Sequence, residues 1–177
     1  MYLKDGYVYE GNFYDNSIEG NGIIYYPNNH PFCEKYIGSF ENNMPNGKGQ
    51  MYCKDGDILE GLWQDGDFRG EGTVTYPENH ISFVKYSGGY ENGAQNGYGK
   101  MLFKNGDFYQ GYWKNGVFDG KGDFRYSKLH LICEKYEGFY KDCKRNGYGK
   151  MTYKDEAIYE GFWENGLANG EGVYYYP

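Results

Sequence analysis

The sequence predicts an all-β repeat protein, a solenoid of about seven stacked β-hairpins. Three observations predict it: two glycine motifs recur at fixed distances, aromatic and polar residues alternate around them, and turn residues separate the alternating stretches. The composition agrees, because the 177 residues include 23 Tyr, 11 Phe and 29 Gly but only 5 Pro. Glycines at fixed intervals within aromatic strings indicate positional roles and argue against disorder.

The repeat consists of two unequal units that together span 50 residues. A Tyr-x-Gly motif, with Leu59 in place of Tyr in one copy, opens each unit. Its glycines are Gly11, Gly38, Gly61, Gly88, Gly111, Gly138 and Gly161. Their steps alternate between 27 and 23 residues, and a Gly-x-Gly motif begins nine residues after each. The array fills residues 1–177, with a half repeat at 1–6 and hairpin units that start near residues 7, 34, 57, 84, 107, 134 and 157.

The pattern of each unit predicts two strands joined by a tight turn. In "YEGFW" at 159–163, rings and glycine alternate with Glu160 and Phe162, which is the period of two that a strand requires. An Asn-Gly pair follows at 165–166, and glycine readily takes the positive φ of a tight hairpin turn. The strand that carries Gly-x-Gly then returns.

Glycine in the middle of a strand weakens a sheet unless it makes room for something. We expect the Tyr-x-Gly glycines to make room for the ring of a neighbouring strand. Two residues after each of them stands an aromatic residue, and these residues are Phe13, Phe40, Trp63, Tyr90, Trp113, Tyr140 and Trp163. Stacked across strands, this structural aromatic row would form the core.

The units differ in the connection after Gly-x-Gly. The four extra residues of the long units lie in the connections 27–35, 77–85 and 127–135. Short units turn at "KDGD" (54–57) or "KNGD" (104–107) instead. The hairpin is therefore the constant element, and the connection varies.

The stretch "YEGFWENGLANGEG" (159–172) resembles the MORN repeat, whose pattern is Y-x-G-x-[WF]-x-x-G-x-x-x-G-x-G. The resemblance covers essentially the whole chain. It implies an elongated, twisted single antiparallel sheet, often curved into an open trough with aromatic residues inside. The sequence departs from the family pattern in its 27-residue units, at Leu59, and at Cys143, which replaces a turn glycine. Either Cys143 is strained, or its turn is of a different kind.

The two ends align with internal repeats. Met1 aligns with the methionines 50, 100 and 150 residues further on, and Pro177 aligns with Pro27 and Pro77. We therefore expect a segment of a longer repeat protein, although a translation start at Met1 would look the same. Abundant Tyr and Asn, with Lys favoured over Arg, is typical of an A/T-rich protist genome.

The formal charge of −7 disfavours binding to nucleic acid or to an anionic membrane surface. Residues 101–150 alone carry +4. Within this block Lys141, Lys144 and Arg145 are the candidate lipid contact, or else a solvated loop.

No apolar run is long enough to span a membrane, and four cysteines are too few for a disulfide framework. A cytoplasmic protein is expected, and the resemblance adds a cytoskeletal or membrane-associated scaffold as an analogy.

Residues with metal-binding chemistry recur in the long connections. His30 and Cys33, like His130 and Cys133, form His-x-x-Cys, which is half a zinc site. Equivalent positions would lie four strands, or roughly 19 Å, apart, so a zinc site would need a second chain. The alternative is that these histidines brace the connections.

The sequence offers no catalytic constellation. "GAQNGYGKM" (93–101) ends in Gly-Lys but lacks the first glycine and the final Ser/Thr of a phosphate-binding loop. The only histidines are locked to the repeat, and the carboxylates are regularly spaced. We predict a non-enzymatic chain without a cofactor.

The leading hypothesis for function is a protein-interaction scaffold that binds a peptide or helix of a partner in the trough or on the outer face. Tyr112, Phe139 and Phe162 alternate onto the face opposite the Tyr row and are candidate contacts, or else ordinary sheet coverage. The resemblance also implies homodimers joined through terminal repeats, which would place Tyr174 and Tyr176 at a dimer end.

Two alternatives come from the resemblance. One is a module that binds phospholipid or a membrane surface. The other is a targeting or regulatory segment of a larger enzyme, such as a lipid kinase or a SET-domain protein.

Overall fold

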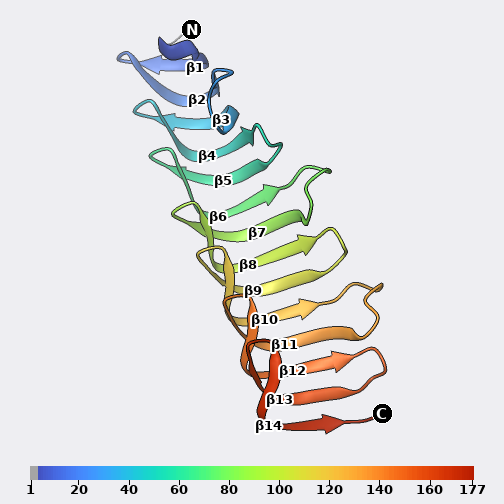
Figure 1. Ribbon diagram of the computed structural model, residues 1–177. Coiled ribbons are helices and arrows are strands. Elements are labelled where there is room, and N and C mark those ends of the chain that lie inside the picture. The colour runs from blue at the N-terminus through green and yellow to red at the C-terminus, as the bar shows by residue number, and fades with distance from the viewer. Residues whose placement is uncertain (1–3) are drawn as a thin grey trace. The chain divides into compact units, whose positions relative to one another are not determined.

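The computed structural model describes residues 4–177 and confirms the all-β fold class. Fourteen antiparallel strands follow one another in chain order in one open sheet (Figure 1). A short 3₁₀ turn, η1 (Lys4–Gly6), precedes them, and the rest of the predicted half repeat at 1–6 lies outside the described residues. The strands are β1 (Val8–Tyr14), β2 (Ser17–Tyr25), β3 (Cys33–Glu41), β4 (Met44–Cys53), β5 (Ile58–Gln64), β6 (Asp67–Thr75), β7 (Phe83–Glu91), β8 (Ala94–Phe103), β9 (Phe108–Lys114), β10 (Val117–Arg125), β11 (Cys133–Lys141), β12 (Lys144–Tyr153), β13 (Ile158–Glu164) and β14 (Leu167–Tyr175).

The hairpins begin at even intervals of 25 residues, although the glycine motifs do not. The strands after the long connections carry two more residues before Tyr-x-Gly than the others do. The long connections are therefore shorter than predicted and comprise residues 26–32, 76–82 and 126–132. The first ends early because the Lys54 N–H donates to the Phe32 carbonyl at 2.8 Å, which extends the pairing of β3 with β4.

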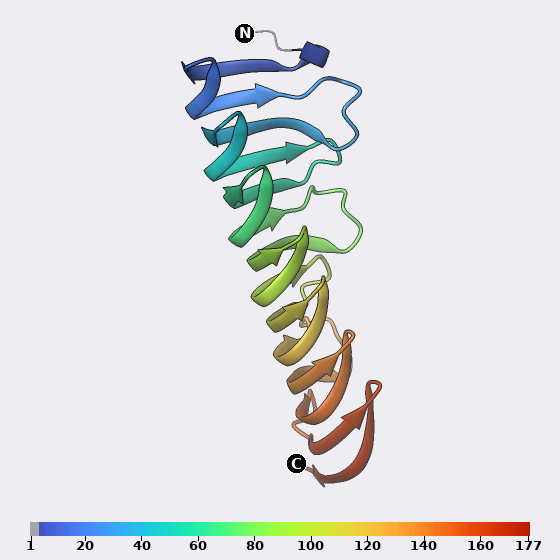
Figure 2. The ribbon, with the colours of Figure 1, turned by 90° about the vertical axis from the view of Figure 1, so that its left-hand side faces the viewer.

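Contacts within the chain define two compact units. Unit 1 comprises the chain up to His80 together with Gly89–Gly93, and unit 2 comprises Ile81–Gly88 and Ala94–Pro177. In Figure 2 the individual hairpins are seen to bend, so that the tight turn curls back over one face. Buried aromatic rings make up most of the core in both units.

The glycines make room for a tyrosine of their own motif. In unit 1 the Tyr36 side chain is fully buried and lies over Gly38 and Gly49. A Cβ added to Gly49 would lie 2.1 Å from the Tyr36 hydroxyl oxygen. The expectation that the ring over Gly38 comes from a neighbouring strand was wrong. The reason is a hydrogen bond: the Tyr36 hydroxyl donates to the Ser39 carbonyl at 3.1 Å, which lays the ring along its own strand.

The hairpin of β5 and β6 replaces this tyrosine with Leu59 and fills the space in another way. The ring of Phe68, on the returning strand, takes the place over the glycines. A Cβ on Gly72 would lie 2.3 Å from the Phe68 ring, and the centroids of Phe68 and Trp63 are 5.0 Å apart. The departure from the family pattern at Leu59 is thus compensated by a ring from the paired strand.

The structural aromatic row is buried except at its first member. Phe40, Trp63, Trp113 and Trp163 each pack against the tyrosine of the preceding Tyr-x-Gly hairpin, with ring centroids 5.1 to 5.3 Å apart. Tyr90 and Tyr140 are buried as well. Phe13, predicted as a core ring, is 44% exposed. It contacts Tyr9 of its own strand, and no preceding hairpin among the described residues covers it.

Cys143 stands in a turn of the same kind as the others. Asp142 and Cys143 have φ of 48° and 61°, which compares with 51° and 67° at Asn42 and Asn43. The Cys143 sulfur accepts a hydrogen bond from the Phe118 N–H at 3.3 Å. Because a left-handed backbone is unfavourable for a residue such as Cys, the turn stores strain there.

We therefore expect Cys143→Asn to raise the free energy of unfolding by about 1 kcal/mol, because Asn tolerates this backbone. The gain includes a better hydrogen bond, since the Asn43 side-chain oxygen accepts from the Ile18 N–H at 2.8 Å in the equivalent turn. Urea denaturation measures the change. The reciprocal Asn43→Cys is the control and should destabilise; equal stability of all three proteins would contradict the prediction.

Candidate protein interface on the sheet

Five aromatic residues lie on the face of unit 2 opposite the core, and we name them the outer aromatic row. They are Tyr98, Tyr112, Phe139, Tyr148 and Phe162, and each is 48% to 52% exposed. Tyr98 is the register partner of Tyr112, with ring centroids 5.7 Å apart, and Tyr148 is that of Phe162, at 5.5 Å. Sequence reasoning placed Tyr112, Phe139 and Phe162 on this face but missed the other two. They are the central residues of Gly-x-Gly, and only the cross-strand register brings them beside the first three.

Glycines on neighbouring strands lie close to the Cβ atoms of two residues of the row. A Cβ at Gly120 would lie 3.0 Å from the Tyr112 Cβ, and one at Gly147 would lie 3.4 Å from the Phe139 Cβ. Both glycines have positive φ, 111° and 88°, so the strand passes close beneath the neighbouring ring. The row is therefore supported from below while its outer side faces solvent.

A second row of polar side chains runs beside the rings. Its members, one from each strand from β8 to β13, are Lys100, Gln110, Asp123, Glu137, Lys150 and Glu160. The Tyr148 hydroxyl donates to a Glu160 carboxylate oxygen at 3.0 Å. The hydrogen bond of Lys135 to Glu137, 2.7 Å long, raises the pKa of Lys135. A depression of about 200 Å³ lies between Tyr98, Tyr112 and these polar groups.

The equivalent positions of unit 1, each 100 residues earlier, are mostly polar. They are Asn12, Ser39, Lys48 and Leu62, in place of Tyr112, Phe139, Tyr148 and Phe162. The Ser39 hydroxyl donates to the Asn21 side chain at 3.0 Å, so this surface forms its own polar contacts. The same scaffold position is aromatic in one unit and largely polar in the other, which the fold itself does not require.

The histidines of the long connections brace the backbone. The His30 Nδ1 accepts a hydrogen bond from the Cys33 N–H at 2.8 Å, and the His130 Nδ1 accepts one from the Cys133 N–H at 2.9 Å. These hydrogen bonds agree with the alternative to a zinc site, in which the histidines of His-x-x-Cys brace the connections. Within residues 4–177, no three His, Cys, Asp or Glu side chains are grouped to hold a metal ion.

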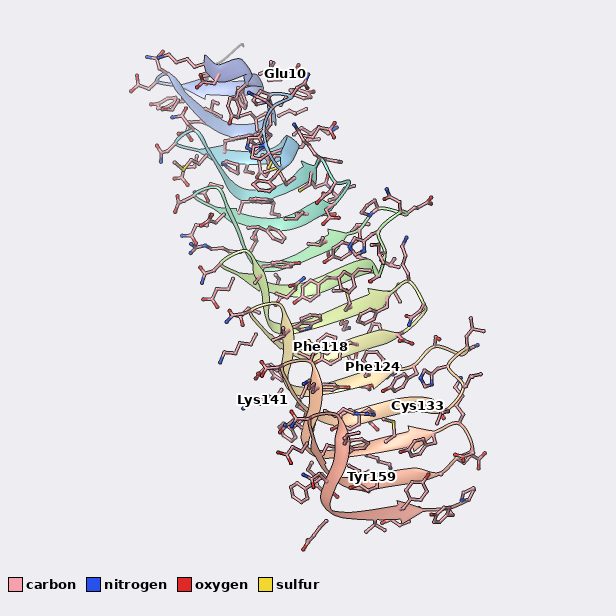
Figure 3. The ribbon with its side chains drawn as sticks, in the orientation of Figure 1. Glu10, Phe118, Phe124, Cys133, Lys141 and Tyr159 are labelled. Atoms are coloured by element: carbon pink, nitrogen blue, oxygen red, sulfur yellow. The ribbon has the colours of Figure 1, made fainter. Side chains whose placement is uncertain are left out.

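The three candidate lipid contacts do not share one environment. Lys141 and Lys144 are exposed at the turn, and Figure 3 shows Lys141 and Cys133 at opposite ends of β11. Arg145 instead donates to the Gly166 carbonyl at 2.6 Å, and its guanidinium carbon lies 4.3 Å from the Trp163 ring centroid. Arg145 is thus committed to contacts within the fold.

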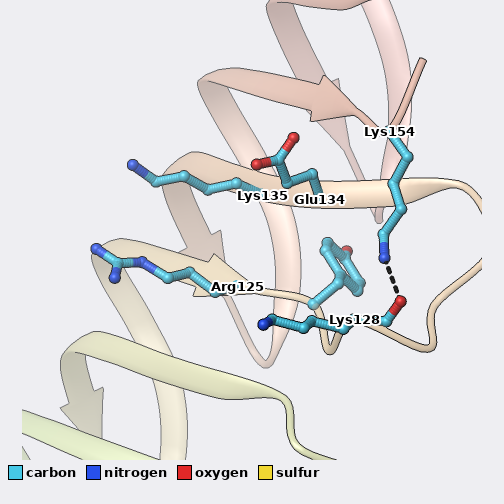
Figure 4. A pocket seen from close by; sticks show the side chains of 6 residues that line it. Arg125, Lys128, Glu134, Lys135 and Lys154 are labelled. Atoms are coloured by element: carbon cyan, nitrogen blue, oxygen red, sulfur yellow. Dashed lines mark hydrogen bonds between the residues drawn. The ribbon is translucent and has the colours of Figure 1, made fainter. Parts of the chain in front are cut away.

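A pocket of about 520 Å³ beside the third long connection is lined by four basic residues together with Tyr126 and the carboxylate of Glu134 (Figure 4). The basic residues are Arg125, Lys128, Lys135 and Lys154. The Lys154 Nζ donates to the Lys128 carbonyl at 2.7 Å. Arg125 and Lys135 both approach one Asp123 carboxylate oxygen, at 3.5 and 3.4 Å. Much of the positive charge here is compensated within the fold, so the pocket is weaker evidence for a partner than the aromatic row.

The proposed dimer end comprises Tyr174, which lies on β14, and Tyr176, which follows this strand. Tyr174 is 40% and Tyr176 82% exposed, and their ring centroids are 4.6 Å apart. Tyr174 also lies 5.8 Å from the ring of Tyr153. The pair is therefore accessible, but it covers a much smaller surface than the outer aromatic row.

Comparison with known families matches the MORN repeat seven times, with the hairpin and glycine geometry described above. The matched residues are 9–30, 36–58, 60–81, 86–108, 109–128, 136–157 and 159–177. The chain belongs to the MORN repeat family. MORN repeats form a non-enzymatic repeat family with known roles in protein and membrane interactions. A search of curated proteins found no match. In the described part of this MORN array, no helix is long and apolar enough to cross a membrane.

Proposed function

We propose that the chain is a non-catalytic protein-interaction module that binds an amphipathic segment of a partner protein along the outer aromatic row. The observation that carries the proposal is the contrast between the units. Five rings stand half exposed across β8 to β13, whereas the equivalent positions of unit 1 hold Asn12, Ser39, Lys48 and Leu62, with Ile37 beside them. Exposed aromatic side chains on a rigid support supply a large share of binding energy in protein interfaces.

The dimensions of the row suit a peptide. From β8 to β13 there are five strand steps, or about 24 Å at roughly 4.8 Å each. An extended segment of about seven residues, or about sixteen residues of α-helix, would cover this distance. The polar row beside the rings offers both donors, such as Lys100 and Lys150, and acceptors, such as Glu137 and Glu160. An amphipathic segment would place its apolar side on the rings and its polar side on the polar row.

A protein partner is favoured over a membrane by charge. The carboxylates of Asp123, Glu137 and Glu160 lie beside the rings, and they would be repelled by anionic lipid headgroups. The polar row holds these three carboxylates against the two ammonium groups of Lys100 and Lys150, so it is not a basic surface, although residues 101–150 as a whole carry +4. Arg145, one of the three candidate lipid contacts, is held by Gly166 and Trp163.

The test is a peptide-display selection on the full chain, repeated on the variant Tyr112→Ser/Phe139→Ser/Phe162→Ser. We expect the full chain to enrich amphipathic peptides. The affinity of the variant for these peptides should be lower by a factor of about ten or more. Leu62→Ser, which changes the unit 1 position equivalent to Phe162, is the matched control and should bind as the unaltered chain does. Circular dichroism establishes that both variants are folded.

Three outcomes would overturn the proposal. The first is equal peptide binding by the chain and the triple variant. The second is binding to vesicles of phosphatidylcholine and phosphatidylserine that the triple variant loses, which would assign the row to lipid. The third is a mass twice 20.5 kDa in light scattering, abolished by Tyr174→Asp/Tyr176→Asp, with no peptide enriched. That result would favour self-association through β14.

A further inference from the structure

Two cysteines that are 20 residues apart in the sequence face each other across the hairpin of β3 and β4. Cys33 is the first residue of β3, Cys53 is the last residue of β4, and the two are register partners. The flanking Lys54 N–H donates to the Phe32 carbonyl at 2.8 Å, which makes Cys33 and Cys53 a non-hydrogen-bonded pair. In a regular pair of this kind the Cα atoms are about 4.5 Å apart and the side chains are at their closest. Here the register shifts between Cys33 and Lys35, directly beside the pair.

The separation of a regular pair lies at the lower end of the range of about 4.4 to 6.8 Å that disulfides span between Cα atoms, so the register places Cys33 and Cys53 where a disulfide can form. Both thiols are free and partly exposed, so a small oxidant can reach them. Burial raises the pKa of both thiols, that of Cys53 to about 12, and the charge of Cys33 is the second cause for Cys53. The influence of Cys33 on the pKa of Cys53 indicates that the two sulfurs lie close together. The raised pKa also keeps both groups mostly as thiols at neutral pH, so their oxidation by peroxide is slow.

The equivalent residue pairs in the hairpins of β7 with β8 and of β11 with β12 cannot form a disulfide. Phe83 and Phe103 fill the position in the hairpin of β7 and β8, with ring centroids 5.7 Å apart, and Cys133 faces Tyr153 in that of β11 and β12. The position therefore holds two aromatic residues, one cysteine with one aromatic, or two cysteines. Of these three hairpins, only that of β3 and β4 has two thiols at this position.

We propose that Cys33 and Cys53 are a redox modification site that forms a reversible intrachain disulfide in the presence of a peroxide. One thiolate attacks a peroxide oxygen, the O–O bond breaks, and a sulfenic acid and hydroxide result. The second thiolate attacks the sulfenic sulfur, the S–O bond breaks, and the oxygen leaves as water once protonated. Each sulfur is oxidised by one electron, both peroxide oxygens are reduced to water, and a thiol reductant reverses the bond.

The disulfide would clamp the base of the connection at 26–32. This connection is already held by His30, which accepts from the Cys33 N–H, and by Lys54, whose Nζ donates to the Asn28 carbonyl. A covalent bond adds a constraint on the unfolded chain, because it closes the loop from Cys33 to Cys53. This inference concerns unit 1 and is independent of the proposed partner interface.

The experiment treats the full chain with hydrogen peroxide and analyses it by thiol labelling and tryptic mass spectrometry. Oxidation is expected to remove two of the four thiols and to join the tryptic peptides 5–35 and 49–54. The unfolding midpoint should rise on the order of 5 °C and return after reduction. Cys33→Ser should abolish both effects while it keeps the other thiols.

Tyr153→Cys is the positive control, because it places a second thiol opposite Cys133 in the same kind of pair. This variant should also join peptides that contain residues 133 and 153. Absence of the 33–53 link, with or without the 133–153 link, would overturn the proposal. So would a link through Cys143, the exposed cysteine, or a link between two chains.

Discussion

Gly49→Ala is expected to lower the free energy of unfolding by about 3 kcal/mol, one of the largest effects of a single methyl group in this chain. The added Cβ would lie 2.1 Å from the Tyr36 hydroxyl oxygen and 2.3 Å from Cζ. Tyr36 is fully buried, so its ring has no free space to enter. Its displacement would also break the hydrogen bond to the Ser39 carbonyl. Urea denaturation followed by far-ultraviolet circular dichroism measures the loss.

Two comparisons separate the steric clash from other effects. Gly66→Ala is the control for backbone strain, because Gly66 has a φ of 85° and nothing within 4 Å of the added Cβ. It should cost only about 1 kcal/mol. The second comparison repeats Gly49→Ala in a Tyr36→Leu background, which lacks the ring, and there the added cost should fall to about 1 kcal/mol or less. An equal cost in both backgrounds would show that the ring over Gly49 is not the cause.

The second large effect is a loss of stability at high pH. Burial raises the pKa of Tyr36 and of Tyr136 to about 12, and it also raises the pKa of Tyr109. In the unfolded chain a tyrosine ionises near 10. Between these values the unfolded chain releases protons that the folded chain retains, so stability is fully present below about pH 10 and falls above it. Each such tyrosine contributes a fall of about 1.4 kcal/mol per pH unit.

Melting temperatures between pH 8 and 12, together with tyrosinate absorbance, check this expectation. We expect a group of tyrosines to ionise only when the sheet unfolds. Tyr36→Phe should make the alkaline fall shallower, because it keeps the ring and removes the ionisable hydroxyl. Cys53→Ser should keep the tyrosine step, because it removes only the Cys53 thiol, whose pKa is also raised. Ionisation of all tyrosines near pH 10 in a folded chain would contradict the prediction.

Sequence reasoning went furthest where neighbours along the chain decide the structure. The period of two in "YEGFW" placed Phe162 on the exposed face, and the same alternation placed Tyr112 and Phe139 there. At Cys143 the sequence left open whether the turn is strained or of another kind, and the φ values of Asp142 and Cys143 show the same kind of turn as at Asn42 and Asn43. Within one strand or one turn, alternation and local backbone sterics leave few choices.

Sequence reasoning failed where a ring could find its space in more than one way. The tyrosine of Tyr-x-Gly lies on its own strand because its hydroxyl reaches the carbonyl three residues on, as from Tyr36 to Ser39. In the hairpin that lacks this tyrosine, Phe68 enters from the paired strand. The glycine spacing shows that a ring needs room, but several rings are close enough to use it.

The sequence by itself determined the seven-fold repetition, the hairpin of each unit and the alternation of side chains between two faces, because these depend on spacing along one chain. Only the tertiary structure decided which residues of different strands meet. It placed Tyr98 beside Tyr112, and it placed Cys33 opposite Cys53. The physical reason is that hydrogen bonds between strands set the register, and a shift of one residue would send every side chain to the other face.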